Sequence, residues 1–198
     1  MAKKSIGPQA HIPMVVSILG TMYQDRPNFM ALGWQCRANF QPPMIAVGVH
    51  SGHATHKGIN ESGAFSLCFP PRSMMEETDL VGILTGDKWD KSEMFTVFNG
   101  VTGAPMIEQC PLCLECEVRD TMNMDTNTLF IGEIKDAFAE ESALTESGNP
   151  DLAAMDPLLL TMPDNRYWSV GQNVGKAWKV GRGLQVRLEA EGRLKKIE

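Results

Sequence analysis

The chain has 198 residues, of which 43% are hydrophobic and 21% are charged, and its formal net charge at pH 7 is -6. These values predict a single globular domain over residues 1–198, and the acidic balance argues against a general nucleic-acid binder, which presents a basic face. No apolar run approaches membrane-spanning length, and the run after the basic start holds Pro13 with no small-residue cleavage site behind it. We therefore expect a cytoplasmic protein with neither nucleic-acid nor membrane partners.

The first half of the chain predicts short strands around one helix. Four apolar runs have strand character: Met14–Leu19, Phe29–Cys36, Met44–His50 and Ala64–Phe69. We expect a loop over Gly20–Asn28, which holds Pro27. A short helix is expected over Ala54–Ser62, followed by Gly63 at the position where a left-handed cap residue is favoured.

The second half predicts one more helix and two more strands. Apolar residues Met75, Leu80 and Leu84 have helical spacing, so we expect a helix over Met74–Leu84. Thr85–Ser92 is expected to be an exposed loop with an aromatic anchor at Trp89. Two strands, Leu112–Arg119 and Leu129–Ala139, are expected on either side of a polar turn, Asp120–Asn127. After them come a polar stretch with one helical turn, Glu140–Ala154, and a last apolar run, Leu158–Met162.

About six short strands with brief helices predict an all-β barrel with short helical insertions. A doubly wound α/β fold needs long crossover helices between parallel strands, and the chain lacks that helical length. The dinucleotide pattern G-x-G-x-x-G after a strand and the phosphate-loop pattern G-x-x-x-x-G-K-[ST] are both missing from the sequence.

The segment His50–Ile59, H-S-G-H-A-T-H-K-G-I, joins a predicted strand to the first helix. A helix start offers free N–H groups and the positive end of the helix dipole, which suits a phosphate. Hydroxyls, a glycine for close approach and positive charges are available from Ser51, Thr55, Gly52, His53, His56 and Lys57. No single face carries all three histidines and no acidic partner is near, so we predict no metal site. A solvated loop before a helix capped by Ser51 or Thr55 is the alternative.

The pattern Cys110-x-x-Cys113-x-x-Cys116 has a spacing seen among iron–sulfur ligands. An extended strand, however, puts Cys113 and Cys116 on opposite faces. On one face Cys116 accompanies Leu114 and Val118, and on the other Cys113 accompanies Glu115 and Glu117. We therefore predict a half-buried strand with free thiols. Five cysteines, an odd number, do not indicate a disulfide framework either.

Two other segments have two open interpretations each. Lysines in the loop Gly86–Ser92 could approach a ligand phosphate or lie in solvent. Residues 163–198 form a predicted C-terminal arm, in which the stretch Tyr167–Trp178 is rich in glycine and aromatic residues. This arm could pack over a partner subunit or a ligand ring, or over its own barrel.

Several motifs follow one another in order from about Pro13 to Leu184. They are W-x(7)-P-P at Trp34–Pro43, H-A-T-H-K-G-I-N-E-S-G-A-F-S, T-D-L-V-G-I-L-T-G-D-K-W-D-K-S-E-M-F, A-P-M-I-E-Q-C-P-L-C-L-E-C, L-F-I-G-E-I, and M-P-D-N-R-Y-W-S-V-G-Q-N-V-G-K-A-W-K-V-G. Together they resemble the flavin reductase-like proteins, specifically the flavoredoxin-like branch.

The resemblance implies a six-stranded Greek-key split barrel that binds FMN and forms a homodimer with the site near the interface. It also implies which positions contact the flavin, with those around the start of the first helix beside the phosphate. These positions are Gly33, Trp34, Gln35, Cys36, Arg37, Asn39, Val49, His50, Ser51, His53, Thr55, His56, Lys57 and Lys88. No metal is implied.

The chain departs from the family pattern at two positions. Cys68 stands where relatives commonly have Asn, and Asn127, a residue on the nicotinamide side of the site, stands where many have His. The resemblance implies an NAD(P)H:flavin oxidoreductase in which the flavin accepts hydride at N5. Because Asn cannot carry the charge of His, the second hypothesis is a flavoredoxin-like carrier that takes electrons from a protein donor without oxidising NAD(P)H. A third is a non-catalytic barrel that binds another phosphorylated small molecule.

Overall fold

The computed structural model describes residues 3–8, 12–194 and 196. Its strands are β1 (Met14–Val15), β2 (Ser17–Tyr23), β3 (Arg26–Leu32), β4 (Gln35–Asn39), β5 (Met44–His50), β6 (Ala64–Phe69), β7 (Val97–Asn99), β8 (Pro105–Ile107), β9 (Leu112–Asn123), β10 (Asn127–Ala139), β11 (Leu158–Thr161) and β12 (Arg166–Ser169). Its α-helices are α1 (Ala54–Ser62), α2 (Met75–Ile83), α3 (Leu152–Met155) and α4 (Arg182–Ala190). Three 3₁₀ turns lie at Arg72–Met74, Ser92–Met94 and Glu141–Ala143. None of the described helices has the length and hydropathy needed to cross a bilayer.

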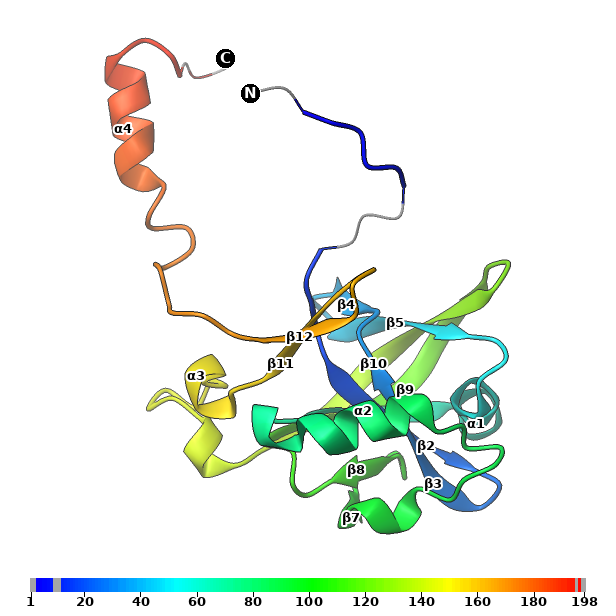
Figure 1. Cartoon of the computed structure of the whole chain (residues 1–198). Helices are drawn as coiled ribbons and strands as arrows, with labels where there is room; N and C mark the ends of the chain where they lie inside the picture. The colour runs from blue at the N-terminus through cyan, green and yellow to red at the C-terminus, as the bar shows by residue number, and fades with distance from the viewer. Residues whose placement is uncertain (1–2, 9–11, 195, 197–198) are drawn as a thin grey trace.

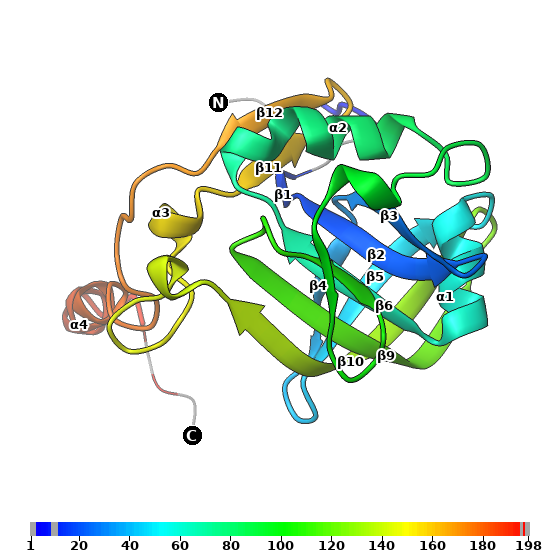
Figure 2. The same ribbon diagram turned by 90° about the horizontal axis from the view of Figure 1, so that it is seen from below.

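The main sheet has seven antiparallel strands in the order β3-β2-β6-β9-β10-β5-β4 and curls around a core, as Figure 2 shows. Three of its neighbouring pairs, β2–β3, β4–β5 and β9–β10, follow one another in the chain. Helix α1 packs mainly on β2, and α2 packs mainly on β3 (Figure 1). The expectation of an all-β architecture with short helical insertions is confirmed.

A smaller sheet joins the two ends of the barrel sequence. Strand β11 pairs with β1 on one side and with β12 on the other. In register, Leu160 lies opposite both Met14 and Tyr167. The first residues of the predicted arm therefore belong to a sheet, and the chain leaves it only after Ser169.

The core consists of two clusters on the two faces of the sheet. Neighbouring residues of one strand go to different clusters: Ile18 and Cys68 to one, Leu19 and Leu67 to the other. Both faces of β2 and β6 are therefore buried, which explains why these strands are apolar without alternation.

The bounds predicted for Met44–His50, Ala54–Ser62 and Ala64–Phe69 are confirmed, and Gly63 ends α1 with a left-handed φ of 68°. The predicted loop Gly20–Asn28 is wrong, because β2 and β3 form a hairpin through Gln24 and Asp25, which have positive φ angles of 51° and 59°. Two consecutive residues with positive φ form a tight turn whose twist matches that of the two flanking strands. Pro27 is accommodated because β3 is an edge strand.

Four other predictions differ from the structure. The predicted strand Met14–Leu19 is divided at Val16 into β1 and the start of β2. The predicted strand Phe29–Cys36 is two strands, β3 and β4, separated at Gly33 and Trp34. Helix α2 buries Thr78 and Val81, whereas Met75 and Leu80 are exposed, because the helix presents a narrow face to β3. The predicted turn Asp120–Asn127 is shorter, since backbone pairing extends β9 to Asn123 and starts β10 at Asn127.

Candidate functional site

The first part of the site is the N-terminal end of α1. After β5 ends, the backbone N–H and hydroxyl of Ser51 both donate to the carbonyl of Thr126, at 3.0 and 3.1 Å. His53 is the N-cap residue, and its side chain makes no capping hydrogen bond. The first turn contains no acidic residue, and neither Ser51 nor Thr55 caps the helix. The start of α1 is therefore open to an anion.

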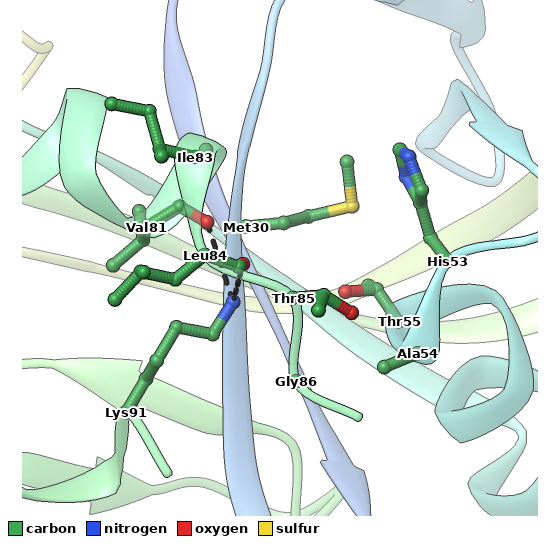
Figure 3. Close-up of a pocket in the computed structure, with 11 residues that line it drawn as sticks. Met30, His53, Ala54, Thr55, Val81, Ile83, Leu84, Thr85, Gly86 and Lys91 are labelled. Atoms are coloured by element: carbon green, nitrogen blue, oxygen red, sulfur yellow. Dashed lines mark hydrogen bonds between the residues drawn. The ribbon is translucent and has the colours of Figure 1, made fainter. Parts of the chain in front are cut away.

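A cleft lies between this helix start and the end of α2; we call it the α1–α2 cleft (Figure 3). Strand β3 forms its floor through Met30. The lining residues are Met30, His53, Ala54, Thr55, Val81, Gly82, Ile83, Leu84, Thr85, Gly86 and Lys91.

Lys91 supplies a buried cation to the α1–α2 cleft. Its side chain is 2% exposed, and its ammonium donates to the carbonyls of Val81 at 3.3 Å and Leu84 at 2.9 Å (Figure 3). Burial lowers the pKa of Lys91 to about 8. In the same loop Trp89, the predicted anchor, is more than half exposed. The resemblance named Lys88 as the flavin-contacting lysine of this loop. Lys91 was indicated only as the other lysine of the same loop.

A buried polar pair lies behind the cleft. The amide nitrogen of Asn28 donates to the hydroxyl of Thr55 at 2.8 Å, and both side chains are buried. The Asn28 carbonyl oxygen is buried and has no hydrogen-bond partner among the described residues. Gly86 packs so closely on this oxygen that any side chain at position 86 would collide with it. A buried acceptor without a donor is uncommon and indicates a missing ligand or water.

The predicted cations of α1 contribute less charge than the sequence indicated. Burial, followed by the charge of His50, lowers the pKa values of His53 and His56, which favours the neutral form of both rings. The ring of His56 also bonds the hydroxyl of Thr128 at 2.9 Å. Lys57 forms an ion pair of 2.8 Å with Asp87.

A second, wider cleft adjoins the first; we call it the Trp34 cleft. The two share His53 in their walls and are therefore neighbours, and we refer to them together as the groove. The indole of Trp34 lies over Gly48, where an added methyl group would sit 3.5 Å from the ring. Asn127 lies directly opposite His50 in the β10–β5 ladder. The lining residues are Ala31, Leu32, Gly33, Trp34, Gly48, His50, His53, Asn127 and Leu160.

The structure brings some of the predicted residues into this groove and leaves others out. It gathers Gly33, Trp34, His50, His53, Thr55 and Asn127. It does not place in either cleft Gln35, Cys36, Arg37, Asn39, Val49, Ser51, His56, Lys57 or Lys88. Val49, for example, points into the barrel core, and Arg37 donates to the carbonyl of Asn39. Sequence reasoning missed Asn28 and Met30, and it indicated Lys91 only as one of the two lysines in the loop Gly86–Ser92.

The motif Cys110-x-x-Cys113-x-x-Cys116 is divided between the two faces of β9 as predicted. Cys116 belongs to the core cluster that contains Leu114 and Val118, and Cys113 belongs to the other cluster. Glu115, on the face of Cys113, is fully buried and accepts hydrogen bonds from the backbone N–H groups of Val101 and Thr102, at 3.1 and 2.9 Å. The strand prediction for Leu112–Arg119 is confirmed, although β9 continues beyond it.

Comparison with known proteins gives the family. Residues 9–167 match the model of the flavin reductase like domain. The chain belongs to this family. A flavoredoxin from Methanosarcina acetivorans is 47% identical, with a TM-score of 0.91, over 93% of this chain and 100% of that one.

Two further solved structures share the fold. The flavoredoxin of Desulfovibrio vulgaris (Miyazaki F) is 33% identical, with a TM-score of 0.86, over 91% of this chain and 100% of that one. An FMN-binding protein from Thermus thermophilus, solved with bound 1-cyclohex-2-enone, is 23% identical, with a TM-score of 0.76, over 89% of this chain and 99% of that one. The expected flavin reductase-type split barrel is thus confirmed, and the family supports a flavin-binding oxidoreductase.

Proposed function

We propose that the groove binds FMN, with the phosphate in the α1–α2 cleft and the ring system in the Trp34 cleft. The observation that carries this assignment is the asymmetry of the groove. One end combines an uncapped helix start, the buried hydroxyl of Thr55 and the buried ammonium of Lys91. The other end is a broad surface with the indole of Trp34 beside it. A phosphate suits the first end, and a flat ring suits the second.

The unpaired acceptor of Asn28 supports FMN over a simple phosphate ester. It lies behind Thr55 and Gly86, both of which line the α1–α2 cleft. A hydroxyl of the sugar-alcohol chain of FMN, or a water molecule that it holds, can donate to this oxygen and satisfy it. The Thr55 hydroxyl, the first amides of α1 and the Lys91 ammonium would then hold the phosphate.

Bound FMN supplies two-electron chemistry that the side chains of this protein do not provide. We propose that the chain uses it as an NAD(P)H:flavin oxidoreductase. In this assignment Trp34 and Gly48 orient the ring, while His50 and Asn127, paired across β5 and β10, offer hydrogen bonds at the open end of the groove. No described residue has to act as a nucleophile or general base.

A second function, electron transfer with a protein donor, is favoured by Asn127. Asparagine can hydrogen-bond a nicotinamide but cannot hold a charge or give up a proton as histidine does. The two flavoredoxins reported above are also similar to this chain over nearly its whole length.

We also propose a homodimer. After Ser169 the chain leaves the small sheet and runs away from the barrel toward α4 (Figure 1). Within this arm Val174 is 98% exposed and Trp178 is 92% exposed. Large apolar side chains left in solvent usually mark an interface, and a two-fold dimer is the commonest way to cover them.

The assignment of the phosphate can be tested with two ligands that differ only by that group. The double variant His53→Ala/Thr55→Ala should lose FMN affinity much more than riboflavin affinity, as measured by flavin fluorescence titration. Stopped-flow mixing with NADH or NADPH then separates the two functions, since a carrier is reduced by dithionite but by neither nucleotide. An equal loss of both flavins in the double variant would sink the phosphate assignment.

A further inference from the structure

Three of the five cysteines meet in a place that the flavin groove does not use. Cys68 comes from β6, Cys110 from the turn after β8, and Cys113 from β9. All three are buried in one core cluster, and all are free thiols. The sequence placed Cys110 and Cys113 in one motif but gave no sign that Cys68 lies beside them.

Cys68 and Cys113 are direct partners in the β6–β9 ladder. In the same ladder the N–H of Val118 donates to the carbonyl of Gly63, which marks a hydrogen-bonded pair. Because the two kinds of pair alternate along antiparallel strands, Cys68 and Cys113, five steps further on, form a non-hydrogen-bonded pair. The Cα atoms of such pairs lie about 4.5 Å apart, which is within the range that a disulfide spans.

Backbone groups of Ile107 hold the two sulfurs side by side. The N–H of Ile107 donates to the sulfur of Cys68 at 3.4 Å, and the thiol of Cys113 donates to the carbonyl of Ile107 at 3.4 Å. Although burial opposes it, hydrogen bonds from the thiols of Cys110 and Cys113 lower the pKa of Cys68 well below its ordinary value. The hydrogen bond to Cys68, together with burial, raises the pKa of the Cys113 thiol, so Cys113 keeps its proton and Cys68 is the sulfur more readily ionised.

An opening leads to the thiols from outside. It is lined by Cys110 and Cys113 and by the rings of Phe98 and Phe138, which meet edge to face with centroids 5.5 Å apart. The carboxylates of Glu108 and Glu140 stand at its rim. This opening shares no lining residue with the two clefts of the flavin groove.

We propose that Cys68 and Cys113 are a redox-active dithiol that reduces small disulfides entering through this opening. The Cys113 sulfur, which lines the opening, attacks one sulfur of the disulfide, whose S–S bond breaks, and the first half leaves as a thiol with the proton of the Cys113 thiol. Cys68 then attacks the sulfur of Cys113 and releases the second half as a thiol with its own proton. The two cysteines lose two electrons and two protons, and the small disulfide gains them.

The rim defines the class of substrate. Two carboxylates attract a cation and repel an anion on the way in. The aromatic walls accept a small aliphatic body. We therefore expect a small cationic disulfide such as cystamine to react at least about tenfold faster than oxidised glutathione, which is anionic.

The test is disulfide mapping of the full-length FMN-loaded protein after exposure to cystamine, acid quenching, alkylation and non-reducing trypsin digestion. A Cys68–Cys113 bond joins peptides 58–72 and 92–119. We expect this linked pair in the unaltered protein and in Cys110→Ser. Cys116→Ser is the matched control, because that buried thiol lies on the same strand but on the other face, and it should keep the link. Cys113→Ser should lose it.

Each other outcome counts against the proposal. A protein that shows no linked peptides after prolonged exposure, while the exposed Cys36 is modified, would overturn it without any variant. A disulfide internal to peptide 92–119 would overturn the pairing of Cys68 with Cys113. Equal rates for cystamine and oxidised glutathione, unchanged in Glu140→Gln, would overturn the role of the rim.

Discussion

The ammonium nitrogen of Lys91 lies 2.9 Å from the carbonyl oxygen of Leu84, the C-cap residue of α2. Carbonyls at the end of a helix lack helical partners, so this contact satisfies one of them and holds the charge in the α1–α2 cleft. One lysine thus stabilises the end of α2 and also faces the open start of α1 across the cleft.

The first prediction concerns the charge of Lys91. Lys91→Met should lower the affinity for FMN by about 10- to 100-fold, since a hydrogen bond to a charged group contributes about 1.5–3 kcal/mol. Riboflavin, which lacks the phosphate, should lose little. Fluorescence titration with both flavins measures this, and Lys88→Met, an exposed lysine of the same loop, is the control. A comparable loss for riboflavin would mean that the variant disturbs the groove as a whole.

The second prediction concerns pH. The pKa of Lys91 in the free protein is about 8, and a bound phosphate raises it because it favours the charged form. FMN binding therefore takes up a proton above pH 8, and the affinity should fall as the pH rises through this value. Riboflavin affinity should stay level over the same range. Titrations with FMN at several pH values measure this, and Lys91→Met should remove the pH dependence of the FMN affinity. A level FMN profile in the unaltered protein would contradict the role given to Lys91.

The third prediction uses the unpaired oxygen of Asn28. Asn28→Ala should weaken FMN and riboflavin by the same factor, because both carry the sugar-alcohol chain. The expected loss is about 0.5–1.5 kcal/mol, the usual contribution of a neutral hydrogen bond. Isothermal titration with the two flavins measures it, with thermal unfolding of the flavin-free protein as the folding control. A loss of affinity confined to FMN would contradict this role and indicate that Asn28 acts on the phosphate.

The fourth prediction separates the reductase from the carrier. Hydride transfer requires the nicotinamide within about 3–3.5 Å of the flavin. Asn127 lies opposite His50 at the open end of the groove, so a histidine there adds a second ring that can hydrogen-bond and titrate near neutral pH. Asn127→His should speed the reduction of bound FMN by NADH or NADPH in stopped-flow experiments. Fast reduction of the unaltered protein with no gain in the variant would show that position 127 does not limit the step.

The fifth prediction concerns the arm. A chain that stops after Ser169 keeps β12 and both core clusters but loses the exposed Val174 and Trp178. It should be a monomer by light scattering at micromolar concentration, whereas the full chain should be a dimer. Trp178→Ser in the full chain should weaken the dimer without changing the thermal unfolding of the barrel. A full chain that is monomeric with FMN bound would contradict the dimer.

Local patterns predicted the elements that depend on local interactions. The bounds of α1, ended by Gly63, and of β5 and β6 follow from short-range sequence signals. So does the alternation that puts Cys113 and Cys116 on opposite faces of β9. The β2–β3 hairpin was missed because Gln24 and Asp25 adopt positive φ without a glycine, and strand pairing stabilises that turn.

By itself the sequence determined the barrel class and the start of α1, because both follow from local patterns of apolar and polar residues. It also determined the family, because the family's motifs follow one another in order along the chain. Only the tertiary structure decided which side chains meet. Lys91 rather than Lys88 reaches the cleft, Asn28 stands behind Thr55, and Cys68 joins Cys113. Such contacts join residues distant in sequence, and burial, which lowers the pKa of Lys91 and leaves the Asn28 oxygen unpaired, exists only once the strands and helices have packed.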